Sequence, residues 1–197
     1  MFLVDTIFNM NIYETYRLVE RLGEITRAHL RKVAVKCGLQ PVQVEVLHYL
    51  VSCNQFSNTV MSVVDYLGQT KGTVSQTIKS LEAKGFVEKI PDAIDKRTVR
   101  LRVTPKGSEL IDRELPGDAF SAALGSLDQE SHSSLKSSLS LLNRALLRTN
   151  NMDTFGVCKT CVHNEKNAEG YFCRLLHIKL KEGEVDKICK EHTPRAL

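Results

Sequence analysis

Up to residue 150, apolar residues recur mostly at spacings of three and four, which is typical of helices with one buried face. The helices predicted from this spacing cover residues 12–36, 41–53, 60–67 and 73–84. The first of them carries two apolar stripes, which indicates that it packs against more than one partner. In the fourth, Val74, Ile78 and Leu81 define the buried face.

The pattern becomes alternating after Gly85, which predicts strands over 86–90 and 98–103 joined by a charged tip, Pro91–Arg97. Another helix is predicted from Pro105 to about Leu115. A last amphipathic helix follows, marked by leucines spaced by four, three and four residues: Leu135, Leu139, Leu142 and Leu146. This order predicts a mainly α protein with one β-hairpin (α+β), that is, a winged helix-turn-helix.

In such a fold the fourth helix buries one face and offers the other to the major groove, which is wide enough to admit a helix. Thr73, Gln76 and Lys79 point away from the buried face. Thr70 and Ser75 are candidates for phosphate contacts at the helix start, and the hairpin tip offers two cations to the minor groove. The DNA-binding residues predicted in this way are Thr70, Lys71, Thr73, Ser75, Gln76, Lys79, Lys96 and Arg97.

The charge distribution supports a polyanionic partner. The whole chain has a formal net charge of only +4, but residues 71–106 contain nine basic side chains against Glu82, Glu88, Asp92 and Asp95. A basic surplus confined to one stretch is typical of nucleic-acid binding. The alternative is an ordinary solvated helix and hairpin.

The stretch Leu67–Gly85, followed by Asp95-Lys96-Arg97 and by Leu101–Gly107, resembles the MarR family of transcriptional regulators, and the resemblance covers about residues 12–149. It implies that Asp95 braces the wing and that Arg97 enters the minor groove. It also implies a homodimer, held by the first and last helices, that binds a pseudo-palindromic double-stranded operator. Members often respond to small molecules, and some sense oxidants through one cysteine, for which Cys37 and Cys53 are candidates. The alternative is a winged helix used for protein contacts.

The composition changes at Met152, which divides the chain into a DNA-binding and dimerisation domain, 1–151, and a cysteine-rich extension, 152–197. The extension holds four cysteines within 32 residues, at Cys158, Cys161, Cys173 and Cys189. Four thiolates, one pair of them in a Cys-x-x-Cys, suit zinc or, alternatively, a 4Fe–4S cluster, and the segment is too short to fold on a core alone. His163, His177 and His192 are spare ligand candidates. The segment resembles cysteine-rich extensions of some MarR-like proteins.

Because four thiolates around a divalent cation leave a negative site, we expect this extension to lie away from DNA, beside the dimerisation helices. Three other interpretations remain open: four thiols without a metal, a module that recruits another protein, and a Cys/His redox enzyme built on Cys158 or Cys161 with His163. No Gly-rich phosphate loop or βαβ pattern accompanies the cysteines, so we predict a protein that is not an enzyme.

The remaining composition sets the class and the compartment. The 197 residues are 42% hydrophobic and 25% charged, which is ordinary for a soluble domain, and no apolar run approaches the ~20 residues that cross a bilayer. The N-terminal residues do not resemble a secretory signal. The sequence therefore predicts a cytoplasmic, homodimeric DNA-binding regulator, most simply a repressor, with reduced thiols and a metal-bound tail. Its alternative is an iron–sulfur or thiol redox-sensing regulator.

Overall fold

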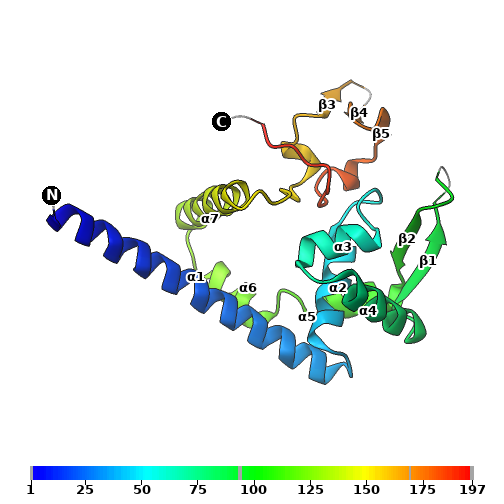
Figure 1. Cartoon of the computed structure of the whole chain (residues 1–197), viewed down its shortest axis with the longest axis horizontal. Helices are drawn as coiled ribbons and strands as arrows, with labels where there is room; N and C mark the ends of the chain where they lie inside the picture. The colour runs from blue at the N-terminus through cyan, green and yellow to red at the C-terminus, as the bar shows by residue number, and fades with distance from the viewer. Residues whose placement is uncertain (1, 93–94, 169, 196–197) are drawn as a thin grey trace. The chain divides into compact units, whose positions relative to one another are not determined.

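The computed structural model describes residues 2–92, 95–168 and 170–195 and divides the chain into two compact units, Met1–Val44 and Glu45–Leu197. The helices are α1 (Phe2–Lys36), α2 (Pro41–Ser52), α3 (Val60–Leu67), α4 (Lys71–Ala83), α5 (Pro105–Glu114), α6 (Asp118–Gly125) and α7 (Gln129–Thr149) (Figure 1). The strands are β1 (Val87–Pro91), β2 (Val99–Val103), β3 (Asn164–Asn167), β4 (Gly170–Cys173) and β5 (Ile178–Leu180). The predicted domain boundary at residue 151 falls inside the second unit and stays a prediction.

The first unit is dominated by α1, which begins ten residues before the predicted start at residue 12. Both of its predicted apolar stripes contain side chains that are exposed to solvent. These side chains are Ile12, Tyr16, Leu18, Val19, Leu22 and Ile25. An amphipathic helix with bare apolar stripes is typical of an interface with another chain.

The second unit contains the predicted winged helix, and its helix ends follow local sequence signals. Thr59 caps α3 and Thr70 caps α4, because each hydroxyl accepts a hydrogen bond from a backbone N–H three residues later, at 3.2 Å in both cases. Gly68 ends α3 with a φ of 62°, a left-handed conformation that glycine adopts without strain. The cap at Thr70 moves the start of α4 two residues ahead of the predicted Thr73.

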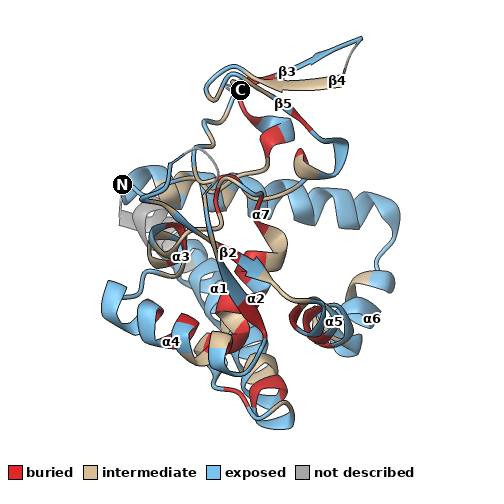
Figure 2. Cartoon of the chain, turned by 90° about the vertical axis from the view of Figure 1, so that its right-hand side faces the viewer, coloured by how far each residue is buried: buried red, intermediate tan, exposed pale blue. Residues whose placement is uncertain are grey.

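The core of this unit lies where α4 contacts α3 and the hairpin. The predicted buried face of α4 is confirmed, since Val74, Ile78 and Leu81 are completely buried. Leu47 from α2 and Leu101 from β2 are also inaccessible to solvent, and Figure 2 shows these inner faces in red. The recognition-type helix is therefore fixed by apolar burial, and its outer face is left for binding.

The hairpin pairs β1 with β2 in antiparallel register, with Val87 opposite Val103, close to the predicted strand limits. Helix α5 starts beside it at Thr104, whose hydroxyl caps the helix. Gly107 in the first turn of α5 approaches the hairpin closely: an added Cβ would lie 2.6 Å from Val103 Cγ1 and 2.7 Å from the backbone oxygen of Phe86.

We expect Gly107→Ala to destabilise the protein by about 1–3 kcal/mol, because a backbone oxygen cannot move aside as a flexible side chain can. Urea unfolding measures the change. Gly125→Ala, also in a helix but with open space around its Cβ, is the matched control. Equal stability of the two variants would contradict the close approach.

After α5 the chain forms two helices, α6 and α7, where a single last helix was predicted. Asp128 separates them, because its carboxylate accepts the backbone N–H of Ser131 at 2.8 Å and so begins α7. Helix α7 has no buried residue, and Figure 2 shows it exposed along most of its length. Three of its predicted stripe leucines, Leu135, Leu139 and Leu146, are exposed.

The extension contains regular structure that the sequence pattern did not predict. Strands β3, β4 and β5 form an antiparallel sheet in that order, and two short 3-10 helices cover Cys158–Thr160 and Glu182–Glu184. Its small core consists of Cys158, Leu180, Val185 and Cys189, with Cys173 and Phe56 packed against them. Three of the four cysteines of the extension, Cys158, Cys173 and Cys189, therefore belong to this core or pack against it.

Candidate nucleic-acid interface and cysteine segment

The start of α4 presents the predicted DNA-contacting side chains on one exposed surface. Those on this helix and its cap are all exposed: Thr70, Lys71, Thr73, Ser75, Gln76 and Lys79. The hydroxyl of Thr70 is shared between the cap and a 2.9 Å hydrogen bond with the hydroxyl of Thr73. Thr70 thus has a structural task in addition to the phosphate contact that was predicted for it.

The tip of the wing is held by the carboxylate of Asp95. Its two oxygens accept hydrogen bonds from the Arg97 backbone N–H and the Thr98 hydroxyl, each at 3.0 Å. Lys96 and Arg97 are exposed, and the Arg97 side chain is 97% accessible. The described geometry gives Asp95 the bracing position, and Arg97 Nε also lies 3.8 Å from Asp95 Oδ1 although its side chain stays accessible. Two residues of the predicted tip, Ala93 and Ile94, lie outside the described part of the chain.

The base of the wing depends on Arg100, a residue that sequence reasoning counted only as positive charge. Its Nε lies 2.6 Å from Asp92 Oδ2, and its Nη1 donates to the backbone oxygen of Phe56 at 2.7 Å. These contacts tie β2 to the connection between α2 and α3. The alternation that predicts β2 could not reveal them, because the partner is 44 residues away.

Some of the basic side chains of residues 71–106 are neutralised by ion pairs, and others remain exposed. Lys89 pairs with Glu82 and Arg102 with Glu88, both at 2.6 Å, while Lys106 donates to the backbone oxygen of Lys84. The cations that remain exposed at the predicted interface are Lys71, Lys79, Lys96 and Arg97. Positive charge is thus placed at the start of α4 and at the wing tip, where phosphates of a bound duplex would lie.

Known proteins share this arrangement. Residues 38–98 match the sequence model of the MarR family. This segment is therefore similar to the winged helix of MarR-family regulators. The chain is 28% identical over 108 residues to an uncharacterized HTH-type transcriptional regulator, YkoM, of Bacillus subtilis (strain 168), covering 55% of this chain and 69% of YkoM.

Solved structures extend the likeness to most of the chain. A MarR transcriptional regulator from Methanosarcina mazei Go1 superposes with a TM-score of 0.58 at 22% identity, over 70% of this chain and 99% of that one. The S. aureus MepR–DNA complex gives 0.54 at 20% identity, over 66% and 96%. At these identities the likeness shows the fold, which is the mainly helical MarR architecture with a β-hairpin wing.

The predicted metal ligands of the extension lie in one small region. Cys158, Cys161 and Cys189 are buried, and Cys173 packs against the core that contains Cys158 and Cys189. A hydrogen bond from the Cys158 thiol to Cys189, helped by contacts of Asn54 and Ser57, lowers the pKa of Cys189 to about 6. The same hydrogen bond raises the pKa of Cys158.

Polar hydrogens already point at these sulfurs, as they do around metal-bound thiolates. Asn54 Nδ2 lies 3.5 Å from Cys158 Sγ, and the Thr193 N–H donates to Cys161 Sγ at 3.4 Å. Within residues 2–92, 95–168 and 170–195, however, no three Cys, His, Asp or Glu side chains form a ready metal site. The four thiols fit a thiophilic ion by their chemistry, and ligation itself stays a prediction.

The histidines of the extension play different parts. Both ring nitrogens of His192 have hydroxyl partners, Thr154 Oγ1 at 2.7 Å and Thr160 Oγ1 at 3.0 Å, and its ring covers Gly156. His192 therefore has a packing role, whereas His163 is half-buried and His177 is exposed. Among the other thiols, Cys53 is a buried small apolar group, since burial raises its pKa to about 12.

The extension is attached at a second place besides the one expected. The extension contacts the winged helix: the Asn54 N–H donates to the Ile188 backbone oxygen at 2.9 Å, and Lys190 forms an ion pair with Asp65 of α3. Burial of Cys158, Cys189 and Phe56 in a common core explains this placement. The start of the extension also lies beside α7, since Asn143 and Leu147 line a hollow together with Thr154 and Phe155. The expected position beside the last helix is therefore found for the start of the extension, whereas the contacts with the winged helix were not expected.

Proposed function

We propose that this protein is a homodimeric, sequence-specific DNA-binding transcriptional regulator, acting as a repressor in the cytoplasm. The observation that carries the proposal is the exposed, N-capped face of α4 beside the Asp95-braced wing, with four exposed cations at the two contact points. MepR, which shares the fold, is named in a complex with DNA. No helix in the described ranges is long and apolar enough to cross a membrane. Selection of binding sites from random duplexes tests the proposal, and it fails if no sequence is enriched.

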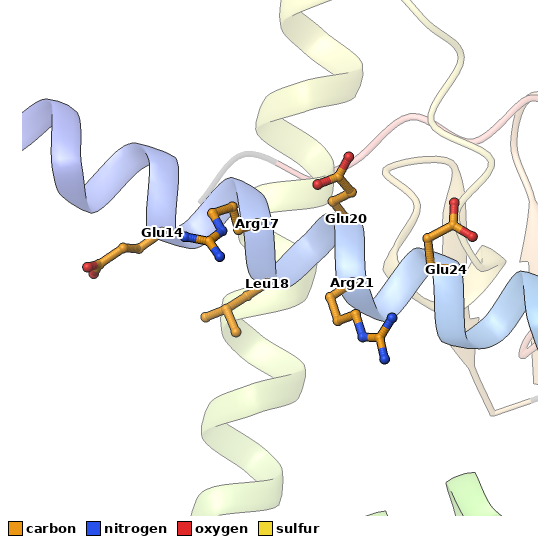
Figure 3. Close-up of a pocket in the computed structure, with 6 residues that line it drawn as sticks. All are labelled: Glu14, Arg17, Leu18, Glu20, Arg21 and Glu24. Carbon is orange, nitrogen blue, oxygen red and sulfur yellow. The ribbon is translucent and has the colours of Figure 1, made fainter.

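The dimer is supported by surfaces that a single chain leaves uncovered. Helix α1 exposes its apolar stripes, and α7 exposes leucines. A hollow along α1 is lined by side chains of both charges, Glu14, Arg17, Leu18, Glu20, Arg21 and Glu24 (Figure 3). A surface with apolar residues and both charges can pair with a copy of itself across a two-fold axis.

We expect Leu22→Glu to convert the dimer to monomers, because the new carboxylate would be buried without a partner in the interface. Sedimentation at micromolar concentration measures the mass. Val35→Glu is the control, since Val35 is 83% exposed on the same helix but lies outside the stripes. Two-fold symmetry also predicts half-sites about 10 bp apart or a multiple. A wild-type monomer with full DNA affinity would overturn the dimer.

Arg97 and Gln76 are expected to contribute differently to DNA binding. Arg97→Ala should weaken binding by about 1–3 kcal/mol and reduce its salt dependence, because a cation at the groove is lost. Gln76→Ala should relax sequence preference, because its exposed side chain can read a base edge. Titrations of specific and random duplexes at several salt concentrations separate these effects. Wild-type behaviour of both variants would mean that wing and helix are misassigned.

We further propose that the extension binds one zinc ion through Cys158, Cys161, Cys173 and Cys189, with a 4Fe–4S cluster as the alternative. Support comes from the shared core of three of these cysteines and from the polar hydrogens directed at two of the sulfurs. Bound zinc would supply a structural cross-link. Metal analysis of anaerobically purified protein tests this. Colourless protein with one zinc per chain supports it, brown protein with iron and sulfide indicates the cluster, and metal-free protein refutes both.

A further inference from the structure

Most of the hydrogen bonds between the described residues of the extension and the winged helix go to one short stretch, residues 52–58, which is the end of α2 and the connection to α3. A further contact is the ion pair between Lys190 and Asp65 of α3. The backbone oxygen of Ser52 accepts the Ile188 N–H, and the Asn54 N–H donates back to the oxygen of Ile188, both at 2.9 Å. The N–H of Gln55 donates to Glu184 Oε2 at 2.9 Å. These bonds make the connection part of the extension's own structure.

The same connection contacts the cysteine core. The Asn54 side chain donates to Cys158 Sγ, and the hydroxyl of Ser57 accepts the N–H of Lys190, the residue after Cys189, at 2.9 Å. Phe56 packs against the core that contains both cysteines. A change at the sulfurs therefore reaches residues 52–58 without any intermediate element.

On its other side the connection supports the wing. The backbone oxygen of Asn58 accepts the Leu101 N–H at 2.8 Å, and the oxygen of Phe56 accepts from Arg100 Nη1 at 2.7 Å. Arg100 in turn holds Asp92, whose carboxylate accepts the N–H of Asp95 in the tip. Seven residues thus join the cysteine core to the strand and tip that present Arg97.

We propose that Zn²⁺ bound by the cysteines of the extension raises the affinity of the protein for DNA by fixing residues 52–58 beneath the wing. This inference rests on the proposed DNA binding and zinc site. Without the metal a short segment of this kind loses order, and its bonds to the connection are lost with it. The wing then has to be ordered when DNA binds, which weakens binding. The metal acts as a co-effector. Typical coupling between two binding sites predicts that zinc raises the DNA affinity by about 5- to 150-fold.

The test weakens the attachment by removing side-chain contacts while leaving every cysteine and the backbone bonds of Ile188 in place. The double variant Lys190→Ala/Glu184→Ala removes the ion pair to Asp65 and the acceptor of the Gln55 N–H. The matched control is Lys159→Ala/Asp186→Ala, which removes a 2.8 Å ion pair that lies within the extension. Each pair deletes one lysine next to a predicted ligand and one acid, so the net charge is unchanged in both.

Full-length wild type and both variants are stripped with a chelator and titrated with Zn²⁺, and DNA affinity is measured with and without the ion. We expect zinc to raise the DNA affinity of wild type and control, and the attachment variant to bind zinc equally but to show a smaller gain in DNA affinity. A full response in the attachment variant overturns the inference. Zinc binding by wild type without a change in DNA affinity overturns it while the zinc site stands, and absence of zinc binding overturns both. Absence of specific DNA binding in either state refutes the proposed function itself.

Discussion

Cys161→Ser is expected to abolish stoichiometric zinc binding and to make residues 152–197 sensitive to protease. Among the described residues, the core cluster of the extension consists of four buried side chains, Cys158, Leu180, Val185 and Cys189, and is therefore small. Structural zinc in short peptides contributes about 10–16 kcal/mol of apparent binding free energy, which is comparable with the whole stability of an ordinary domain. A serine hydroxyl at this position does not replace the thiolate ligand.

Limited proteolysis with mass spectrometry, together with metal analysis, measures both effects. Cys37→Ser is the control, because Cys37 is half-buried in the first unit and is not a predicted ligand. The helices of the winged helix should remain protected in both variants, since their buried residues such as Ile78 and Leu101 belong to a separate apolar core. Unchanged metal content and unchanged protection in Cys161→Ser would refute the four-cysteine site.

Periodicity predicted the winged helix well because its elements are set by local signals. The spacing of Val74, Ile78 and Leu81 gave the buried face of α4, and Gly68 and Gly85 marked two helix ends. The boundaries that moved did so for local reasons as well. Thr70 is the N-cap of α4, and Asp128 is the N-cap of α7 and separates it from α6. Both are residue types that are common at N-caps, so the sequence alone could have identified these helix starts.

The placement of the extension could not be predicted in the same way. Its attachment depends on pairs that are more than 100 residues apart, such as Asn54 with Cys158 and Ser57 with Lys190. Nothing in the spacing of cysteines indicates which surface they meet. Arg100 illustrates the same limit within the wing, because a charge count treats it like Lys96 although it is a half-buried tie to Phe56.

Leu81→Ala is expected to lower the free energy of unfolding by about 2–5 kcal/mol. Leu81 is completely buried on α4, and its truncation leaves a cavity that close-packed neighbours fill only in part. Because its side chain is on the inner face of the helix, the exposed surface around Gln76 keeps its chemical character. The variant should therefore bind DNA with wild-type sequence preference at temperatures where it remains folded.

Urea unfolding and a site-preference assay on the same preparations separate the two faces of α4. Gln76→Ala provides the comparison, since its exposed side chain should change stability by less than about 0.5 kcal/mol while altering preference. If Leu81→Ala were as stable as wild type, the helix would not be held by its apolar face. If Leu81→Ala changed sequence preference while folded and Gln76→Ala did not, the two faces of α4 would be assigned the wrong way round.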